Sequence, residues 1–342
     1  MGNSKRKIIS IGLAAVLLLA GYAFLFLHEQ KQKSDRLNES STVFDTFLYQ
    51  GTAYTLSTVT ENYTDQRSIL RAASGDNGYL ILPGESGRWC PEIQRIVYAK
   101  GKKIYTCDIN GADREAVFQI SGRRAHAMLR DVIGGYAVVY RSYEDARNYS
   151  SLGSGVYYLI DLTSGRALET EISAPAGISP LALDDGWFYF GTGTIDGSYA
   201  DIRRCSLETG KCEILTSDIP EYVGDPGCVA DGYLYFHYAY GDVYRVPVGG
   251  GKVEKPDIDF GGMGARGVAG MIGYDGTCLL ACICRDDHGA VTLRVYALDG
   301  DQSLREVRSF DVDEFYHLTS LRVQDDILIA SSRNAVSLYG RL

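Results

Sequence analysis

The stretch Asp231–Gly250 reads DGYLYFHYAYGDVYRVPVGG and contains the unit from which the fold is built. Asp231-Gly232 precedes an aromatic-rich apolar run, and a second run of aromatic and β-branched residues ends at Gly249-Gly250. Asp-Gly favours the two-residue turns of β-hairpins, whereas Tyr, Phe and Val favour strands. The stretch therefore predicts two antiparallel strands joined by the loop Tyr238–Asp242.

Similar units recur along the chain with a period near 45 residues. The first turn residues of successive units lie at spacings of 51, 46, 44 and 50, and they are Gly135, Gly186, Gly232, Gly276 and Asp326. Several strands per unit at such a period are typical of a β-propeller, because each small sheet buries both faces against its neighbours. The sequence thus predicts an all-β fold, a β-propeller of four-stranded blades over residues 43–342.

The number of blades depends on residues 51–84. If Ala53–Thr58, Ser68–Ala72 and Gly78–Leu82 are strands of one blade, the propeller has seven blades, and if this region is irregular it has six. Seven blades would average about 43 residues each, which is close to the observed period. We also expect Val43–Gln50 (VFDTFLYQ) to complete the last blade, Leu318–Leu342, because an open sheet edge invites aggregation.

A resemblance follows from the repeated unit, in which Asp-Gly precedes two aromatic residues, and Tyr-Arg and an aliphatic residue precede a glycine turn. This pattern resembles bacterial extracytoplasmic β-propeller proteins of unassigned function, and it is distantly similar to TolB-like and YWTD-type propellers. The resemblance covers roughly residues 90–342, and the literal Tyr-Trp-Thr-Asp tetrapeptide is absent. Its motifs are structural, so it implies a binding or scaffolding module and no catalytic residue.

The N-terminal region contains an apolar stretch, Ile8–Leu27, of twenty uncharged residues preceded by Lys5, Arg6 and Lys7. A helix of this length spans about 30 Å, the thickness of the hydrocarbon core of a bilayer. Because basic residues favour the cytoplasmic side, we expect a cytoplasmic tail (1–7), a transmembrane signal anchor (8–27), a polar linker (28–42) and an extracytoplasmic propeller. The alternative is a cleaved signal peptide, for which Gly21-Tyr22-Ala23 is the best site.

The charge and the motifs exclude several classes of function. The chain has a net charge of −9, and since residues 1–42 carry +3, the remainder carries −12. Nucleic acids and anionic lipid surfaces are bound by Lys and Arg, so neither is expected as a partner of this domain. No Gly-x-Ser-x-Gly motif, P-loop or dinucleotide fingerprint is present, and the histidines His126, His237, His288 and His317 are scattered. We therefore expect no cofactor, no metal site and no identifiable catalytic residue.

Eight cysteines in an extracytoplasmic domain make a disulfide plausible. Cys205 and Cys212 flank a turn and would lie directly opposite each other if the loop were Leu207–Gly210. A shorter loop, Glu208–Gly210, which the position of the glycine favours, would turn the two sulfurs to opposite faces of the sheet. Three further cysteines share one face of a predicted strand and are expected to be buried thiols: Cys278, Cys282 and Cys284.

The loops between the second and third strands of the blades are long and rich in tyrosine, and they should lie on one face of the propeller. Loops on a rigid scaffold often carry binding sites, and tyrosine combines contact area with a hydroxyl. The predicted ligand-binding residues are Tyr143, Tyr149, Tyr199, Tyr238, Tyr240 and His288. The function expected is a membrane-anchored module that binds a protein, peptide or glycan. The alternatives are a propeller-fold glycosidase or lyase, and a structural component of an envelope assembly.

Overall fold

The computed structural model describes residues 42–62, 65–72, 79–82, 84–123, 125–143, 156–173, 178–193, 199–217, 219, 227–237, 242–260, 265–285, 288, 290–300, 302–312, 318–332 and 337–342. The chain divides into two units, Met1–Ser41 and Thr42–Leu342. The predicted anchor Ile8–Leu27 and most of the predicted linker belong to the first unit, which lies outside the described residues. Among the residues that are described, no helix has the length and apolar character needed to cross a bilayer.

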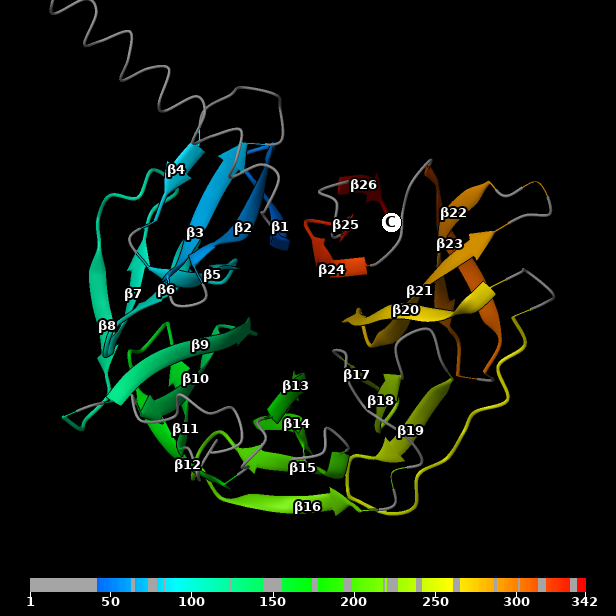
Figure 1. Cartoon of the computed structure of the whole chain (residues 1–342). Helices are drawn as coiled ribbons and strands as arrows, with labels where there is room; N and C mark the ends of the chain where they lie inside the picture. Colours follow the sequence, from blue (N-terminus) through cyan, green and yellow to red (C-terminus); the bar gives the residue numbers. More distant parts are fainter. Residues whose placement is uncertain are drawn as a thin grey trace, which may run out of the picture. The chain divides into compact units, whose positions relative to one another are not determined.

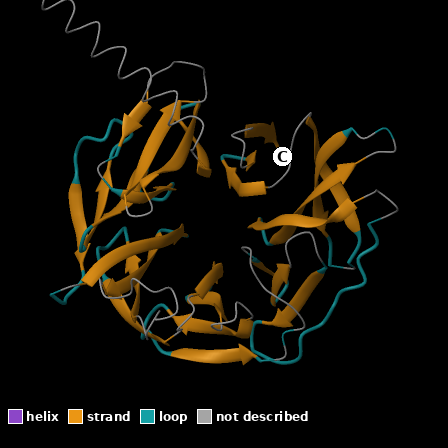
Figure 2. Ribbon diagram, viewed as in Figure 1, coloured by secondary structure: helices purple, strands orange, loops and turns teal. Residues whose placement is uncertain are grey.

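The unit Thr42–Leu342 consists of antiparallel sheets that follow one another in chain order around a central opening (Figure 1), with strands and no helices in its described part (Figure 2). The first sheet contains β1 (Thr42–Tyr49), β2 (Thr52–Asn62), β3 (Asp65–Ala72) and β4 (Tyr79–Ile81). The second contains β5 (Glu85–Cys90), β6 (Arg95–Lys100), β7 (Lys103–Cys107) and β8 (Glu115–Gln119). The third contains β9 (Ala125–Ile133), β10 (Tyr136–Tyr143), β11 (Val156–Asp161) and β12 (Ala167–Ser173).

The remaining sheets continue this pattern. The fourth contains β13 (Ile178–Asp184), β14 (Trp187–Gly193), β15 (Tyr199–Ser206) and β16 (Cys212–Thr216). The fifth has three described strands, β17 (Cys228–Ala230), β18 (Tyr233–His237) and β19 (Val243–Pro247). The sixth contains β20 (Ala265–Tyr274), β21 (Thr277–Arg285), β22 (Val291–Leu298) and β23 (Leu304–Val312). The seventh has three described strands, β24 (Leu318–Gln324), β25 (Ile327–Ser332) and β26 (Ser337–Arg341).

The predicted turns and strands are confirmed where the repeated unit begins. The five predicted turns each precede a second strand of a sheet, and those strands are β10, β14, β18, β21 and β25. At Asp231-Gly232 the φ angles are 50° and 76°, and at Asp275-Gly276 they are 48° and 72°. Positive φ at both positions defines the hairpin turn that Asp-Gly favours, because glycine reaches this region without steric cost. The three strands predicted within residues 51–84 are also present, as β2, β3 and β4.

The prediction that Val43–Gln50 completes the last blade is wrong. This segment forms β1, which pairs with β2 in the first sheet, with Tyr49 opposite Thr52. Gln50 and Gly51 have φ angles of 49° and 75°, so they form the same tight hairpin turn as the Asp-Gly pairs. Because the turn has only two residues, β1 pairs with β2 and belongs to the first sheet, not to the seventh.

The first and seventh sheets meet through side chains. β1 contacts both β24 and β25. The side-chain oxygen of Gln324 accepts a hydrogen bond from the Leu48 N–H at 3.2 Å, and the Gln324 amide nitrogen donates to the Leu48 carbonyl at 2.6 Å. The amide group of Gln324 thus makes the two backbone hydrogen bonds with Leu48 that a neighbouring strand would make.

The apolar core lies between consecutive sheets. Six clusters of buried side chains each span one pair of neighbours, from the first and second sheets to the sixth and seventh. Between the first two sheets, the rings of Phe47 and Trp89 stack with their centroids 4.3 Å apart. Between the fifth and sixth sheets, a disulfide joins Cys228 to Cys278. The expectation that Cys278 is a thiol is therefore wrong, because its partner lies on another sheet, whereas Cys282 and Cys284 are buried as expected.

The two ends of the ring differ in their connections. In each sheet the strands run in sequence order, so the turns after the first and third strands lie at one end and those after the second and fourth at the other. Connections within a sheet are two to seven residues long at the first end. The other end, called the loop face below, carries the long connections 144–155 and 217–227, whereas the connection 248–264 follows a third strand and begins at the first end. The loops between second and third strands were predicted to be long, but three of them have only five residues, which is no longer than turns at the opposite end: 194–198, 238–242 and 286–290.

Candidate binding site

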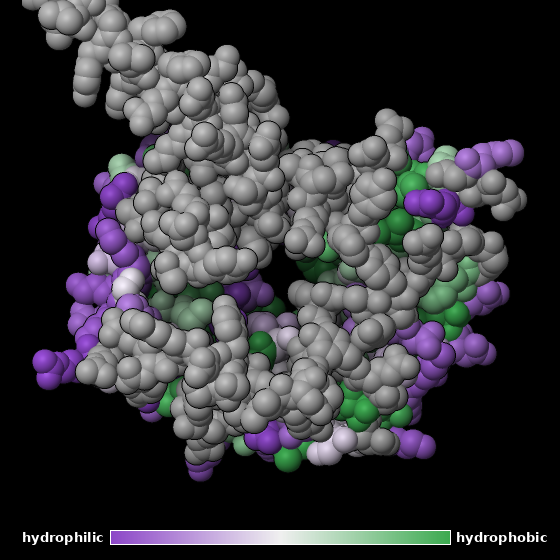
Figure 3. Space-filling model, viewed as in Figure 1, coloured by the Kyte–Doolittle hydropathy of each residue, from purple (hydrophilic) through white to green (hydrophobic). Residues whose placement is uncertain are grey.

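A cavity of about 510 Å³ lies inside the ring, lined by the first strands of five sheets and by the turns that follow them. Figure 3 shows an opening in the middle of this unit with hydrophilic and hydrophobic atoms at its edge. A second cavity of about 370 Å³ adjoins the first and shares Ile133, Gly134, Ile272 and Gly273 with it. Because both cavities include turns that follow first strands, they lie toward the end opposite the loop face.

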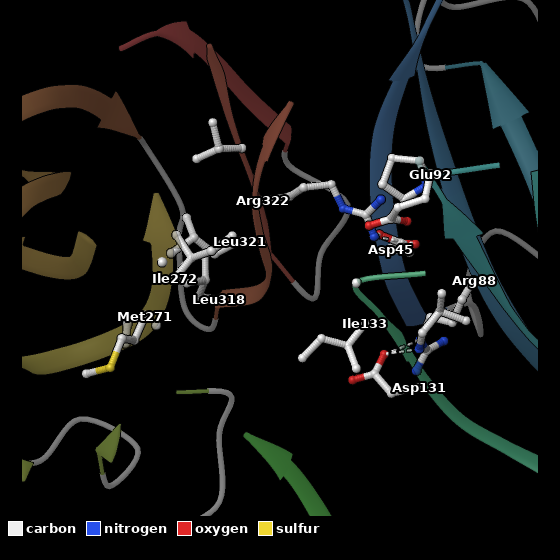
Figure 4. Close-up of a pocket in the computed structure, with 17 residues that line it drawn as sticks. Asp45, Arg88, Glu92, Asp131, Ile133, Met271, Ile272, Leu318, Leu321 and Arg322 are labelled. Atoms are coloured by element: carbon white, nitrogen blue, oxygen red, sulfur yellow. Dashed lines mark hydrogen bonds and ion pairs between the residues drawn. The ribbon is translucent and has the colours of Figure 1, made fainter. Parts of the chain in front are cut away.

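One wall of the larger cavity is charged (Figure 4). Arg322 of β24 donates to both carboxylate oxygens of Asp45 of β1, at 2.9 and 3.1 Å. The backbone N–H of Trp89 donates to the same carboxylate at 2.8 Å. The Asp45 side chain is only 3% exposed. A buried carboxylate is stable only when it is paired and hydrogen-bonded, so these contacts tie the first, second and seventh sheets together.

A second ion pair crosses from the second sheet to the third. The guanidinium of Arg88 lies 3.6 Å from the carboxylate of Asp131, which also accepts the N–H of Val132 at 2.8 Å. Burial raises the pKa of Asp131, while Arg88 and the Val132 N–H oppose this effect. Asp45 raises the pKa of Asp131 further and Arg322 lowers it, so the two ion pairs interact electrostatically.

Glu92 is the third carboxylate of this wall, in the turn after β5, and its side chain is exposed. The thiol of Cys90 donates to it at 3.2 Å. Burial and the charge of Glu92 raise the pKa of Cys90 to about 12, so this cysteine stays protonated. Within the described part of the chain Glu92 forms no ion pair, and its carboxylate is available at the cavity.

The opposite wall is apolar and comes from β20 and β24 (Figure 4). Met271 and Ile272 of β20 and Leu318 and Leu321 of β24 are among the residues that line it. The cavity can therefore hold a ligand that has an apolar side and a polar or cationic group. Among the residues that the structure describes, no cluster of three or more His, Cys, Asp and Glu side chains is arranged to hold a metal ion.

Three of the six predicted ligand-binding residues belong to the described part of the structure, so the predicted site stays a prediction. Tyr149, Tyr238 and Tyr240 lie outside the described residues. Tyr143 ends β10 and Tyr199 begins β15, both at strand ends that lead into the loop face. The sixth residue, His288, is exposed in the turn between β21 and β22. His288 is not among the residues that line the cavity.

The preference for a short loop between Cys205 and Cys212 is wrong. The Ser206 N–H donates to the Lys211 carbonyl at 2.9 Å, so the loop is Leu207–Gly210 and the two cysteines are register partners. Their sulfurs are 2.6 Å apart. Oxidation of this pair stays a prediction.

The sequence contains one signal for the charged wall that its periodicity does not reveal. The first strands of the sheets contain eight charged residues among mostly uncharged neighbours, and four of these form the ion pairs of the wall: Asp45, Arg88, Asp131 and Arg322. A charge is rarely buried without a partner, so each of these positions predicts a partner on another element.

Comparison with solved structures identifies the fold. The chain is 12% identical to Pyrococcus horikoshii acylaminoacyl peptidase, with a TM-score of 0.55 over 90% of this chain and 52% of that chain. It is 13% identical to the β-propeller domain of the Trilobed protease from Pyrococcus furiosus, for which an open velcro topology is described, with a TM-score of 0.50 over 88% and 94% of the two chains. It is 9% identical to a chain of the mitotic checkpoint complex, with a TM-score of 0.51 over 84% of each chain.

These comparisons concern the fold and not the activity. The chain spans about half the length of the acylaminoacyl peptidase. No protein family matches the sequence, and no curated protein matches it. At these identities a likeness shows the architecture alone. The all-β unit Thr42–Leu342 is therefore a β-propeller.

Proposed function

We propose that this protein is a binding or scaffolding module, a seven-bladed propeller that takes a segment of a protein or peptide partner into its central cavity. The observation that carries the proposal is the cavity of about 510 Å³, with one charged and one apolar wall. Ligand sites commonly have volumes of about 300–1,000 Å³, apolar walls and a few placed polar groups. A peptide segment with an apolar side chain and a cationic group matches both walls.

The charged wall favours binding over catalysis. Asp45 and Asp131 are each engaged by an arginine from another sheet, so neither carboxylate is unpaired. These pairs hold the ring together and leave Glu92 as the carboxylate that can meet a cationic group. A second candidate, a carbohydrate-active enzyme, is favoured by the raised pKa of Asp131, because a protonated carboxyl can act as a general acid.

The experiment compares two surfaces of the full-length protein in detergent. The immobilised protein is screened against peptide and glycan libraries, and the ligands obtained are tested with Glu92→Gln and with the double variant Tyr238→Ala/Tyr240→Ala. If the cavity is the site, Glu92→Gln should weaken binding about tenfold or more, since a lost charged contact costs roughly 1.5–3 kcal/mol. The double variant on the loop face should leave binding unchanged. Glu208→Gln, in an exposed turn of the fourth sheet, is the matched control.

Three outcomes distinguish the candidate functions. Binding that is lost in the tyrosine double variant and kept in Glu92→Gln would place the site on the loop face. Cleavage of a glycan by the purified protein, lost in Asp131→Asn, would establish the enzyme. An absence of any ligand for either surface would leave a structural role in an envelope assembly as the better account.

The proposed location is outside the cytoplasm, on an anchor formed by Ile8–Leu27. The basic residues before this segment support the orientation. The disulfide Cys228–Cys278 also supports it, because disulfides persist mainly in oxidising compartments. A protease added to intact cells should degrade the domain while the mature protein retains residues 1–27. A mature N-terminus near Phe24 would show a cleaved signal peptide instead.

A further inference from the structure

Cys205 and Cys212 lie at the turn end of the hairpin β15–β16, in the fourth sheet. The Cys205 side chain is fully buried, whereas Cys212 is partly exposed. Their sulfurs are 2.6 Å apart, and the Cys205 thiol donates to the Gly210 carbonyl at 3.1 Å. The two sulfur atoms are thus in contact on one face of the sheet, in a pair of which one residue is partly exposed.

The backbone permits a bond between these sulfurs without rearrangement. Ser206 and Lys211 form the hydrogen-bonded pair next to the turn, so Cys205 and Cys212 occupy the next, non-hydrogen-bonded pair. Residues in such pairs have Cα atoms about 4.5 Å apart, which lies within the range of about 4.4–6.8 Å seen in disulfides.

The other cysteines offer no competing partner. Cys228 and Cys278 are already bonded to each other. Burial raises the pKa of Cys90 and Cys282 to about 12 and that of Cys107 to about 11, and it also raises the pKa of Cys284. Because the thiolate is the species that exchanges with disulfides, these four side chains are unreactive near neutral pH.

We propose that Cys205 and Cys212 form a second disulfide, which is exposed at Cys212 and exchanges with low-molecular-weight thiols and disulfides. In the forming direction, the Cys212 thiolate attacks a small disulfide such as oxidised glutathione, and one molecule of thiol leaves. The Cys205 thiolate then attacks the Cys212 sulfur of the mixed disulfide, and the second thiol leaves. Two protein thiols are oxidised and one small disulfide is reduced to two thiols. The bond Cys228–Cys278, with both residues almost fully buried, should not exchange under the same conditions.

Mass spectrometry of the full-length protein in detergent tests this proposal. One sample is incubated with oxidised and another with reduced glutathione under native conditions, and both are then labelled with N-ethylmaleimide and digested without reduction. Trypsin cleaves after Lys211, and the peptide 212–245 contains Cys228 as well as Cys212. The bond would therefore appear as the peptide of Cys205 joined to the linked peptides of Cys228 and Cys278. We expect the joined peptides and no label in the oxidised sample, and two labels in the reduced sample. The link between Cys228 and Cys278 should be present in both.

Two variants serve as controls. Cys282→Ser should leave this pattern unchanged, whereas Cys212→Ser should release the peptide of Cys205 and keep the link between Cys228 and Cys278. Labelling of Cys205 and Cys212 as separate thiols in the oxidised sample would overturn the proposal. Reduction of Cys228–Cys278 before Cys205–Cys212 would overturn the claim that the second bond is the exchangeable one.

Discussion

The interface between the first and second sheets and the interface between the seventh and first sheets join similar elements by different means. The former is built around the stacked rings of Phe47 and Trp89, which are at most 1% exposed. At the latter, Arg322 pairs with Asp45, and Gln324 bonds to the backbone of Leu48. None of the hydrophobic clusters formed by the described side chains spans the seventh and first sheets.

The path of the chain accounts for this difference. Consecutive sheets are linked by connections of 3 to 17 residues, so their apolar faces are held close together. The polar pairs that close the ring join residues 276 or 277 positions apart. Apolar contact is non-directional, whereas hydrogen bonds require a defined distance and angle. Polar contacts therefore fix the register of two sheets that no short connection aligns.

Trp89→Ala should give the largest loss of stability, because it removes the centre of the first apolar interface. Truncation of a buried Trp or Phe costs about 3–5 kcal/mol, since it combines lost burial with a cavity. Urea unfolding followed by circular dichroism would measure this loss. Trp187→Ala is a control of the same residue type, because Trp187 is only partly buried and should cost less. Equal losses in the two variants would contradict the assignment of Trp89 to the core.

Arg322→Ala should break the polar interface, because it leaves the Asp45 carboxylate buried without a cation. Removal of one partner of a buried ion pair costs about 3 kcal/mol or more. The double variant Asp45→Asn/Arg322→Ala should be more stable than Arg322→Ala alone, because no uncompensated charge remains. Unfolding of the three proteins forms the test, and a double variant that is less stable than Arg322→Ala would refute this account.

Gln324→Ala should have a smaller effect, about 1–2 kcal/mol, because it removes two hydrogen bonds to Leu48. Gln324→Glu keeps an acceptor for the Leu48 N–H and loses the donor to its carbonyl, so it should fall between the wild type and the alanine variant. Native-state hydrogen exchange of the Leu48 amide would report the contact directly. Unchanged protection of that amide in Gln324→Ala would mean that the side chain does not help to close the ring.

Asp131→Asn should produce the smallest effect, visible as a change in pH dependence. Burial raises the pKa of Asp131 above its ordinary value of 3.8, so the folded state holds this proton more tightly than the unfolded state. The folded protein then binds more protons between about pH 4 and the raised pKa, and the free energy of unfolding falls as the pH rises through this window. The variant lacks this contribution. The free energy of unfolding of the variant minus that of the wild type should therefore increase from about pH 4 up to the raised pKa. Parallel pH profiles from urea unfolding would contradict the raised pKa.

The sequence predicted the local elements well because their causes are local. The Asp-Gly pairs need the positive φ angles found at Asp231-Gly232 and Asp275-Gly276, and the apolar runs after them need burial on both faces. These two features predict a hairpin, and their recurrence along the chain predicts a series of hairpins. A single hairpin cannot bury its apolar faces, so a repeated hairpin predicts a ring of packed sheets. The strands within residues 51–84 follow from the same signals.

Tertiary structure alone decided which distant residues meet. The sequence does not reveal that Asp45 faces Arg322, that Cys228 bonds to Cys278, or that the cavity lies among the first strands. The closing role expected of Val43–Gln50 was wrong because a turn of two residues pairs β1 with β2. Turn propensity and alternation of apolar residues act over a few positions and can be read from the chain. Ion pairs, disulfides and cavities depend on how whole sheets pack, and only the folded ring brings their members together.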